Sequence, residues 1–180
     1  MAVPNTPGTL QALLGRRPRG PFEVVLHDEH GDPLVIRNGP VLDDGAPMPT
    51  RYWLVGRRAK LAVDRLEAAG GVRAAAAAVG PEELEQAHVR YAAERDAALP
   101  AGWDGPRPAG GVGGTRRGVK CLHAHYAWFL VGGDDPVGRW VAARLAEEAA
   151  REAKAAPEQG GPGRRPRPGS GGRDGRPAGG

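Results

Sequence analysis

The first third of the chain alternates short apolar runs with residues that favour turns. Residues 22–26 (FEVVL) and 34–36 (LVI) are rich in side chains that favour strands. The turn-forming sequence HGDP at 30–33 stands between them, so the two runs predict a β-hairpin. A further run at 51–55 (RYWLV) predicts a third strand.

After residue 56, apolar positions recur at intervals of three and four residues, which is the period of a helix with one buried face. This pattern predicts helices at 57–69, 72–79, 81–99, 119–131 and 137–155. A short helix is also predicted near the start of the chain, at 9–14. Strands that come first and helices that follow indicate an α+β fold. We expect a small antiparallel sheet, made of the hairpin plus one strand, covered by four to five helices.

The sequence changes character at its C-terminal end. Residues 156–180 are rich in glycine, proline and arginine, with no aromatic residue and no aliphatic residue larger than alanine. Such a segment cannot bury enough apolar surface to offset the entropy lost on ordering, so we predict a disordered tail. Residues 10–155 are expected to form a single α+β domain.

The charge of the chain is concentrated in this tail. Five arginines and two acidic residues give it a charge of +3, against +4 for the whole chain. The predicted domain is therefore nearly neutral, which argues against a dedicated nucleic-acid-binding surface and leaves at most weak contact between nucleic acid and the tail. The single cysteine excludes an internal disulfide and suits a reducing compartment. No apolar run approaches the roughly 18 residues of a membrane span, so we expect a cytoplasmic protein.

That cysteine lies in the apolar run VKCLHAHYAWF, residues 119–129, with His123 and His125 close behind it. On a helix, residues four apart share a face, so Cys121 and His125 would be neighbours and His123 would be rotated by roughly 200° from Cys121. Zinc binds both thiolate and imidazole. The candidate zinc ligands are therefore Cys121, His125 and, from the hairpin turn, His30.

Two other interpretations of this run stay open. A helix N-terminus and the imidazole of His125 could activate Cys121 as a nucleophile, although no sequence signature of a cysteine enzyme is present. Alternatively, Leu122, Tyr126 and Phe129 belong to a helix that is apolar almost all round. Such a helix is typically buried, and its cysteine and histidines would then be ordinary core residues.

A glycine-rich basic loop precedes this run, with the sequence GGVGGTRRGVK at 110–120. Backbone amides at Gly113 and Gly114, a helix N-terminus, and the charges of Arg116, Arg117 and Lys120 together predict an anion or phosphate site. The loop lacks the spacing of a P-loop. The alternative is an exposed loop with solvated arginines.

Several pieces of the chain occur in a known order over about residues 13–140, namely GRRPRG, MPTRYWLV, LEAAGGV, GVGG, VKCLHAHYA and DPVG. In these pieces the chain resembles the bacterial, mainly actinobacterial, domain-of-unknown-function family 501. The resemblance implies no established activity. It implies cysteines in a Cys-x-Cys-Gly turn, where this chain has DEHG at 28–31, and a cysteine before proline, where it has Gly56-Arg57.

These observations lead to two functional expectations. The first is a non-catalytic protein that binds a phosphate-bearing ligand or a protein partner through the loop at 110–120. The second is a zinc-binding module, or a metal-dependent enzyme, that uses Cys121, His125 and His30. The sequence contains no convincing pair of carboxylates for hydrolase chemistry.

Overall fold

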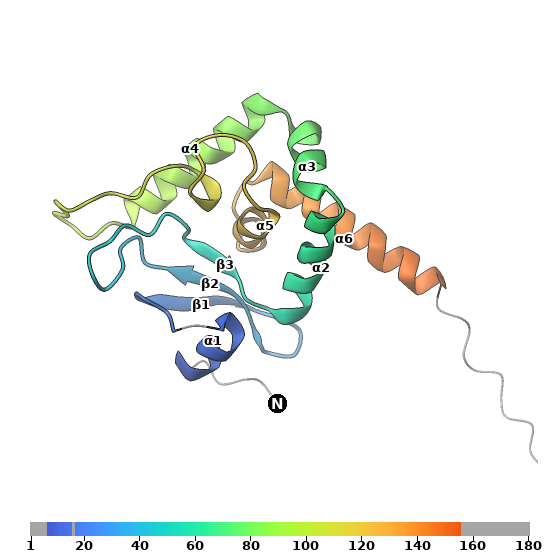
Figure 1. The fold of residues 1–180 in the computed structure, drawn as a ribbon, viewed down its shortest axis with the longest axis horizontal. Helices are drawn as coiled ribbons and strands as arrows, with labels where there is room; N and C mark the ends of the chain where they lie inside the picture. Colours follow the sequence, from blue (N-terminus) through green and yellow to red (C-terminus); the bar gives the residue numbers. More distant parts are fainter. Residues whose placement is uncertain (1–6, 16, 156–180) are drawn as a thin grey trace, which may run out of the picture.

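The computed structural model describes residues 7–15 and 17–155 of the chain. The predicted disordered tail at 156–180 lies outside the described residues. Three strands and seven helical segments follow one another in these ranges (Figure 1): α1 (Pro7–Leu14), β1 (Phe22–His27), β2 (Pro33–Asn38), β3 (Tyr52–Leu54), α2 (Arg57–Ala68), α3 (Gly71–Val79), α4 (Pro81–Ala97), η1 (Val112–Gly114), α5 (Leu122–Leu130) and α6 (Pro136–Ala155).

The three strands form one antiparallel sheet, as the sequence predicted, and the structure shows their order to be β1-β2-β3. Ile36 in the central strand pairs with Val24 on one side and with Trp53 on the other. The hairpin turn is closed by Asp28, whose carboxylate accepts hydrogen bonds from the backbone amides of His30 and Asp32 at 2.9 Å. The bond from Asp32 is the main cause that lowers the pKa of Asp28.

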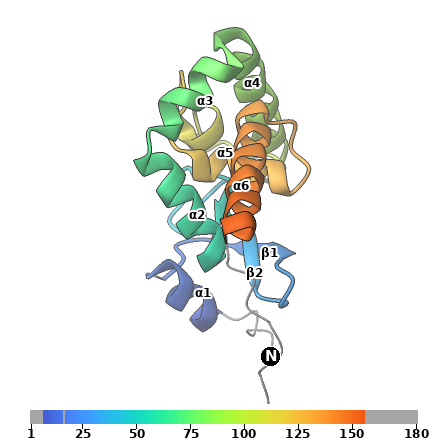
Figure 2. The same ribbon diagram turned by 90° about the vertical axis from the view of Figure 1, so that its right-hand side faces the viewer.

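The helices lie in a layer on one face of the sheet, and α1 lies on the other (Figures 1 and 2). Because successive side chains of a strand point to opposite faces, Val35 joins the large core beneath the helices, whereas the neighbouring Ile36 joins a smaller cluster. Leu14 and Trp53 pack against that smaller cluster. The sheet is therefore covered on both faces.

Helix α5 occupies the middle of the helical layer and contacts both β3 and α6. It approaches α6 so closely that a Cβ atom on Gly138 would lie 2.3 Å from the Cβ of Phe129. Trp128 of α5 is buried, and its ring meets Tyr91 of α4 edge-on with 5.1 Å between centroids. Burial raises the pKa of Tyr91 to about 12. Helix α5 is therefore largely buried, although His123, Tyr126, Phe129 and Leu130 are only partly so.

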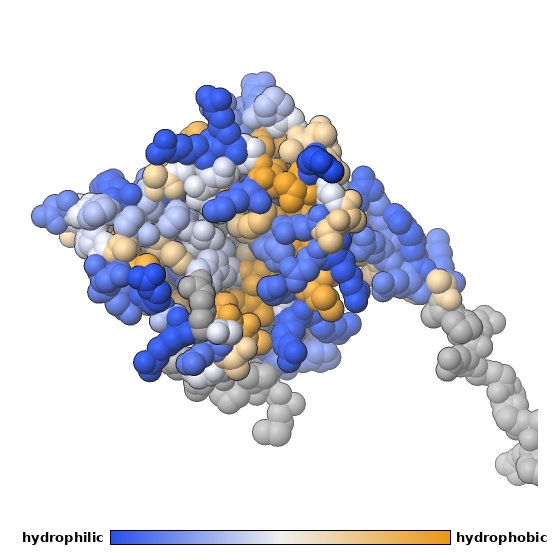
Figure 3. Space-filling model, in the orientation of Figure 1, coloured by the Kyte–Doolittle hydropathy of each residue, from blue (hydrophilic) through white to orange (hydrophobic). Residues whose placement is uncertain are grey.

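The molecule carries apolar side chains near the centre of the face shown in Figure 3, with hydrophilic side chains around them. Helix α6 runs out from the body beyond its contact with α5 (Figure 1). Among the described residues, no helix combines the length and the apolar composition that crossing a membrane requires.

Candidate functional site

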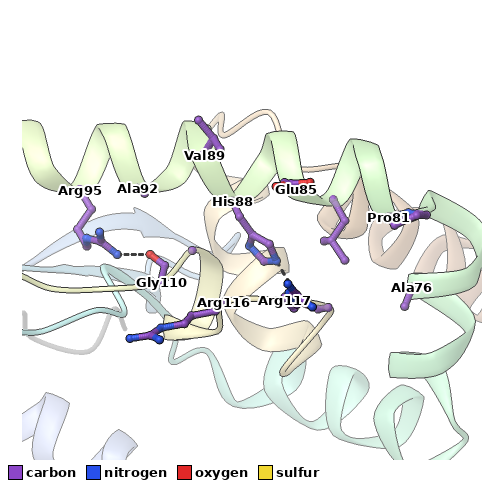
Figure 4. A pocket seen from close by; sticks show the side chains of 13 residues that line it. Ala76, Pro81, Glu85, His88, Val89, Ala92, Arg95, Gly110, Arg116 and Arg117 are labelled. Carbon is purple, nitrogen blue, oxygen red and sulfur yellow. Dashed lines mark hydrogen bonds between the residues drawn. The ribbon is translucent and has the colours of Figure 1, made fainter.

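A large pocket lies between α4 and the segment at 110–118 (Figure 4). Its volume is about 710 Å³, which lies within the usual range for small-molecule sites. One wall is formed by α4 and the end of α3, and the other by the glycine-rich segment. The lining residues are Ala76, Pro81, Leu84, Glu85, His88, Val89, Ala92, Arg95, Gly110, Gly111, Arg116, Arg117 and Gly118.

His88 fastens the two walls together at the centre of this pocket. Its Nδ1 accepts a hydrogen bond from the amide of Val112 at 3.1 Å, so the proton must lie on Nε2, which donates to the carbonyl of Gly118 at 3.0 Å. Burial lowers the pKa of His88, and the ring is therefore held in its neutral form. The contact requires glycine at position 111, because a Cβ there would lie 2.4 Å from the His88 side chain.

Arg95 lies about two helical turns after His88 on α4 and holds the same segment. Its guanidinium donates to the carbonyl oxygens of Gly110 at 2.5 Å and of Pro108 at 3.2 Å, and it forms an ion pair with Asp96 at 2.8 Å. The side chain is only 2% exposed, and its positive charge interacts with Asp96 and with backbone carbonyls of the protein. Sequence reasoning missed this residue. The available signal was the spacing of Arg95 from Leu84 and His88, which places it on the same buried face of α4.

Arg116 and Arg117 are the exposed cations of the pocket and come from the wall opposite α4 (Figure 4). Within the described part of the chain, neither guanidinium forms an ion pair with a carboxylate. The loop around them is ordered by Thr115, whose hydroxyl donates to the carbonyl of Arg117 at 2.8 Å. Glu85 is the acidic side chain among the lining residues.

The other residues of the predicted anion site lie elsewhere. Gly113 and Gly114 belong to η1 and do not line the pocket. The amide of Gly114 donates a hydrogen bond to the carbonyl of Gly111 at 2.9 Å. The side chain of Lys120 lies beside Gly113, and Lys120 is not among the residues that line the pocket. The structure therefore offers guanidinium groups to a ligand in this pocket, and the amide of Gly114 is already bonded.

The helix that was predicted from 119 begins only at Leu122. Cys121 has an extended backbone and is the residue before the first turn. The amide of Leu122 donates to the carboxylate of Glu67 at 2.5 Å, so this side chain on α2 takes up a free donor at the start of α5. Cys121 and His125 are consequently not one helical turn apart on a shared face, which is the assumption behind the predicted zinc ligands.

In the described ranges, His125 and His30 do not form a group of three closely spaced ligand atoms with Cys121. His125 is fully buried, and its Nδ1 lies 2.8 Å from the carboxylate of Asp135, which also accepts the amide of Gly138 at the start of α6. His125 is thus a core histidine bonded through Nδ1, and its buried Nε2 has no hydrogen-bond partner among the described residues. His30 is exposed in the hairpin turn, with Glu29 at 3.5 Å. The structure does not bring the two histidines to Cys121.

The neighbours of Cys121 are instead His123 and Glu67. The ligand-type atoms of these three residues lie within 4.8 Å of one another, and they form the one such group of three in the described ranges. His123 places Nδ1 3.2 Å from Glu67 and Nε2 3.1 Å from Asp64. Burial tends to lower the pKa of His123, but the hydrogen bond with Cys121 and the two carboxylates outweigh it and raise the pKa.

A second pocket opens beside this group. It has a volume of about 450 Å³ and is lined by Cys121 and His123 together with residues of α1, α2, α5 and β3 and their flanks, namely Leu14, Thr50, Tyr52, Trp53, Leu54, Lys60 and Ala124. Two of the three residues of this group, Cys121 and His123, therefore line a pocket of small-molecule size, whereas Glu67 does not line it. The Arg116–Arg117 pocket shares no lining residue with it.

Comparison with known proteins gives one match. A family model described as "Protein of unknown function (DUF501)" matches residues 24–143, a range that contains the whole lining of the first pocket and all of the second pocket's lining except Leu14. No curated protein and no solved structure matches the chain.

Proposed function

Since the chain belongs to the DUF501 family of proteins of unknown function, we propose a function from the pocket itself: non-catalytic binding of a phosphate-bearing ligand between α4 and the segment at 110–118. The observation that carries this proposal is the pair of exposed guanidiniums, Arg116 and Arg117, in the lining of this pocket. Guanidinium groups match the oxygens of phosphate in geometry and charge.

The charges around the pocket support an anionic ligand. The guanidinium of Arg95 is saturated by Asp96 and by backbone carbonyls, and neutral His88 has both ring nitrogens bonded to the loop. The charges left for a ligand are therefore those of Arg116 and Arg117, against the single carboxylate of Glu85. The balance favours a group with at least one negative charge.

The opposite wall supports a ligand that also has an apolar or planar part. It consists of small and apolar side chains of α3 and α4, among them Ala76, Leu84, Val89 and Ala92. Val89 is 64% exposed, which is unusual for a large hydrophobic residue in this chain. A phosphate held by the arginines would place the rest of an amphiphilic ligand against this wall.

The lining also explains why we propose binding without catalysis. A general base must have a free lone pair or carboxylate within reach of the reacting proton. His88 uses both nitrogens to hold the loop, and no cysteine or serine lines the pocket. Glu85 is exposed on α4, with no second group in the lining to orient it.

Calorimetric titration of the purified full chain tests this proposal. The probes are inorganic pyrophosphate and adenosine monophosphate, which joins a phosphate to a planar ring. We expect Arg116→Ala with Arg117→Ala to weaken binding by about tenfold or more, because charge-assisted hydrogen bonds are lost. The matched control is Arg57→Ala with Arg73→Ala, which removes the same charge from exposed positions on α2 and α3.

Equal affinity in both double variants would contradict the proposal, because general charge attraction would then explain the binding. No binding of either probe by the unmodified chain would also contradict it. The alternative of a protein partner would then gain weight, since exposed Val89 lies at the rim of the same pocket.

A further inference from the structure

We propose that Glu67, Cys121 and His123 bind a divalent cation of the zinc class, with one coordination position open to the second pocket. Thiolate, imidazole and carboxylate are the three side-chain types that zinc takes as ligands. The site is separate from the arginine pocket, and it combines Cys121 with His123 and Glu67 in place of His125 and His30, which the sequence suggested.

The spacing of the three groups fits one ion. All three ligand atoms lie within 4.8 Å of one another, and Nδ1 of His123 lies 3.2 Å from the carboxylate of Glu67. Bonds of roughly 2.0–2.3 Å in a tetrahedral arrangement place neighbouring ligand atoms about 3.2–3.8 Å apart. Small side-chain rotations would therefore bring the three atoms around one ion.

The fold fixes two of the ligands before any ion arrives. Glu67 lies on α2 and is tethered by the amide of Leu122. That bond sets the carboxylate directly beside Cys121, whose extended backbone ends the loop before α5. His123 follows in the first turn of the same helix. The site is thus built where the start of one helix meets the side of another.

The charges also suit a divalent cation. A thiolate at Cys121 and the carboxylate of Glu67 would neutralise its two positive charges. Asp64 lies 3.1 Å from Nε2 of His123, although the angle is not that of a good hydrogen bond. A carboxylate on the far nitrogen of a histidine ligand is the usual support of a metal-bound imidazole. Asp64 is itself held by Lys60 at 2.9 Å.

The open position follows from the number of ligands and from the pocket. Zinc sites with three protein ligands keep the fourth position for water or an exchangeable ligand, whereas sites with four are closed. Cys121 and His123 line the pocket of about 450 Å³, and Tyr52, Trp53 and Lys60 contribute to its walls. A ligand in this pocket could reach the ion directly.

The experiment is a titration of the reduced, untagged full chain with cobalt(II), followed by competition with zinc(II). We expect one equivalent of cobalt to produce a thiolate-to-cobalt charge-transfer band, which zinc then removes. Adding thiocyanate should shift the visible cobalt bands if one position is open. Absence of the charge-transfer band at stoichiometric cobalt, together with no zinc binding, would overturn the proposal.

Variants assign the ligands. Cys121→Ser should abolish the charge-transfer band, His123→Gln should weaken cobalt binding by about 100-fold, and Asp64→Asn by about 10-fold to 100-fold. The matched control is His30→Gln, an exposed histidine, which should bind like the unmodified chain. Equal loss in the control would overturn the assignment.

A further readout on the unmodified chain does not depend on any variant folding. Zinc should slow the alkylation of Cys121 by iodoacetamide, because a coordinated thiolate is a poor nucleophile. A thiol, an imidazole and a carboxylate in a row are also the arrangement of a cysteine nucleophile. Fast alkylation that zinc does not slow would overturn the metal site and favour that other chemistry.

Discussion

The two pockets of this molecule use similar residue types in opposite ways. In the pocket beside α4, His88 and Arg95 form hydrogen bonds that hold the segment at 108–118. The other two arginines of this pocket, Arg116 and Arg117, form no ion pair with an acidic residue in the described ranges. In the pocket beside α2, every charged group has a partner of opposite sign, and a thiol lies among them. The proposal of an anion in the first pocket rests on the two uncompensated arginines. The proposal of a cation at the second pocket rests on the three ligand-type atoms that lie within 4.8 Å of one another.

The histidines make the same contrast. Burial lowers the pKa of His88, which lies among backbone groups, whereas Cys121 and two carboxylates raise the pKa of His123 against the effect of burial. The residues are alike in type and differ in the groups that face them. The chemical role of each follows from packing between distant segments.

The largest expected effect comes from Arg95, which anchors the loop of the first pocket. Arg95→Ala would leave the carbonyls of buried Pro108 and half-buried Gly110 without this donor, and would leave Asp96 without its cation, so it should lower the free energy of unfolding by about 3 kcal/mol. Urea denaturation checks this, with Arg107→Ala as an exposed control. A loss below about 0.5 kcal/mol would show that the loop is held by other contacts.

A smaller effect is expected at Gly111. A methyl group there would meet the ring of His88, so Gly111→Ala should cost about 1–3 kcal/mol and break the bond between the Val112 amide and Nδ1. Thermal unfolding measures the first effect, and the nitrogen chemical shifts of the His88 ring measure the second. An unchanged ring spectrum would refute the proposed clamp.

On the side of the second pocket, Glu67→Gln should cost about 1 kcal/mol in metal-free protein. The carboxylate accepts the amide of Leu122 at the positive end of α5, and the neutral amide group does this less well. The comparison variant is Glu85→Gln, which changes an exposed glutamate of α4 and should leave the free energy of unfolding unaltered. If both variants lose the same amount, the capping role of Glu67 is wrong.

The smallest effect is a pH dependence from His88. Burial lowers its pKa below the usual 6.5, so the unfolded chain binds a proton that the folded chain refuses. Stability from this group is present above pH 6.5 and falls as the pH drops from 6.5 toward the lowered value. The neighbouring ring of His125 adds to the lowering, while Asp135 and Glu85 oppose it.

Unfolding free energies at pH 7.5 and 5.5 check the sign. The contribution of His88 makes the free energy of unfolding lower at pH 5.5 than at pH 7.5. We expect this decrease to be smaller in His88→Gln than in the unmodified chain, because the variant has no imidazole that takes up a proton on unfolding. A larger difference in the variant would reverse the assignment.

Much of the fold could be read from the sequence because its signals are local. The hairpin, the third strand and the long helices after residue 56 follow from apolar periodicity and turn residues within each segment. Helices α2, α3 and α4 begin within one residue of their predicted starts, whereas α5 begins three residues later than predicted. The strand predicted at 51–55 is shorter in the structure, covering Tyr52–Leu54.

The candidate site could be read only in part. Arg116 and Arg117, which line the first pocket, are visible in the sequence as arginines next to a glycine-rich stretch, and their binding of an anion stays a prediction. The start of α5 is not visible in the sequence, because it depends on a bond between Leu122 and Glu67, which are 55 residues apart. That one bond moves the helix start past Cys121 and places His123, in place of His125, beside the thiol.

The most direct test of the account is a two-dimensional amide spectrum of the full chain, titrated first with adenosine monophosphate and separately with zinc. The nucleotide should shift the amides of Gly110, Gly111 and Gly118, and leave those of Cys121 and His123 in place. Zinc should do the reverse. Shifts of both groups by either addition would contradict the central claim that the molecule carries two separate sites of opposite charge preference.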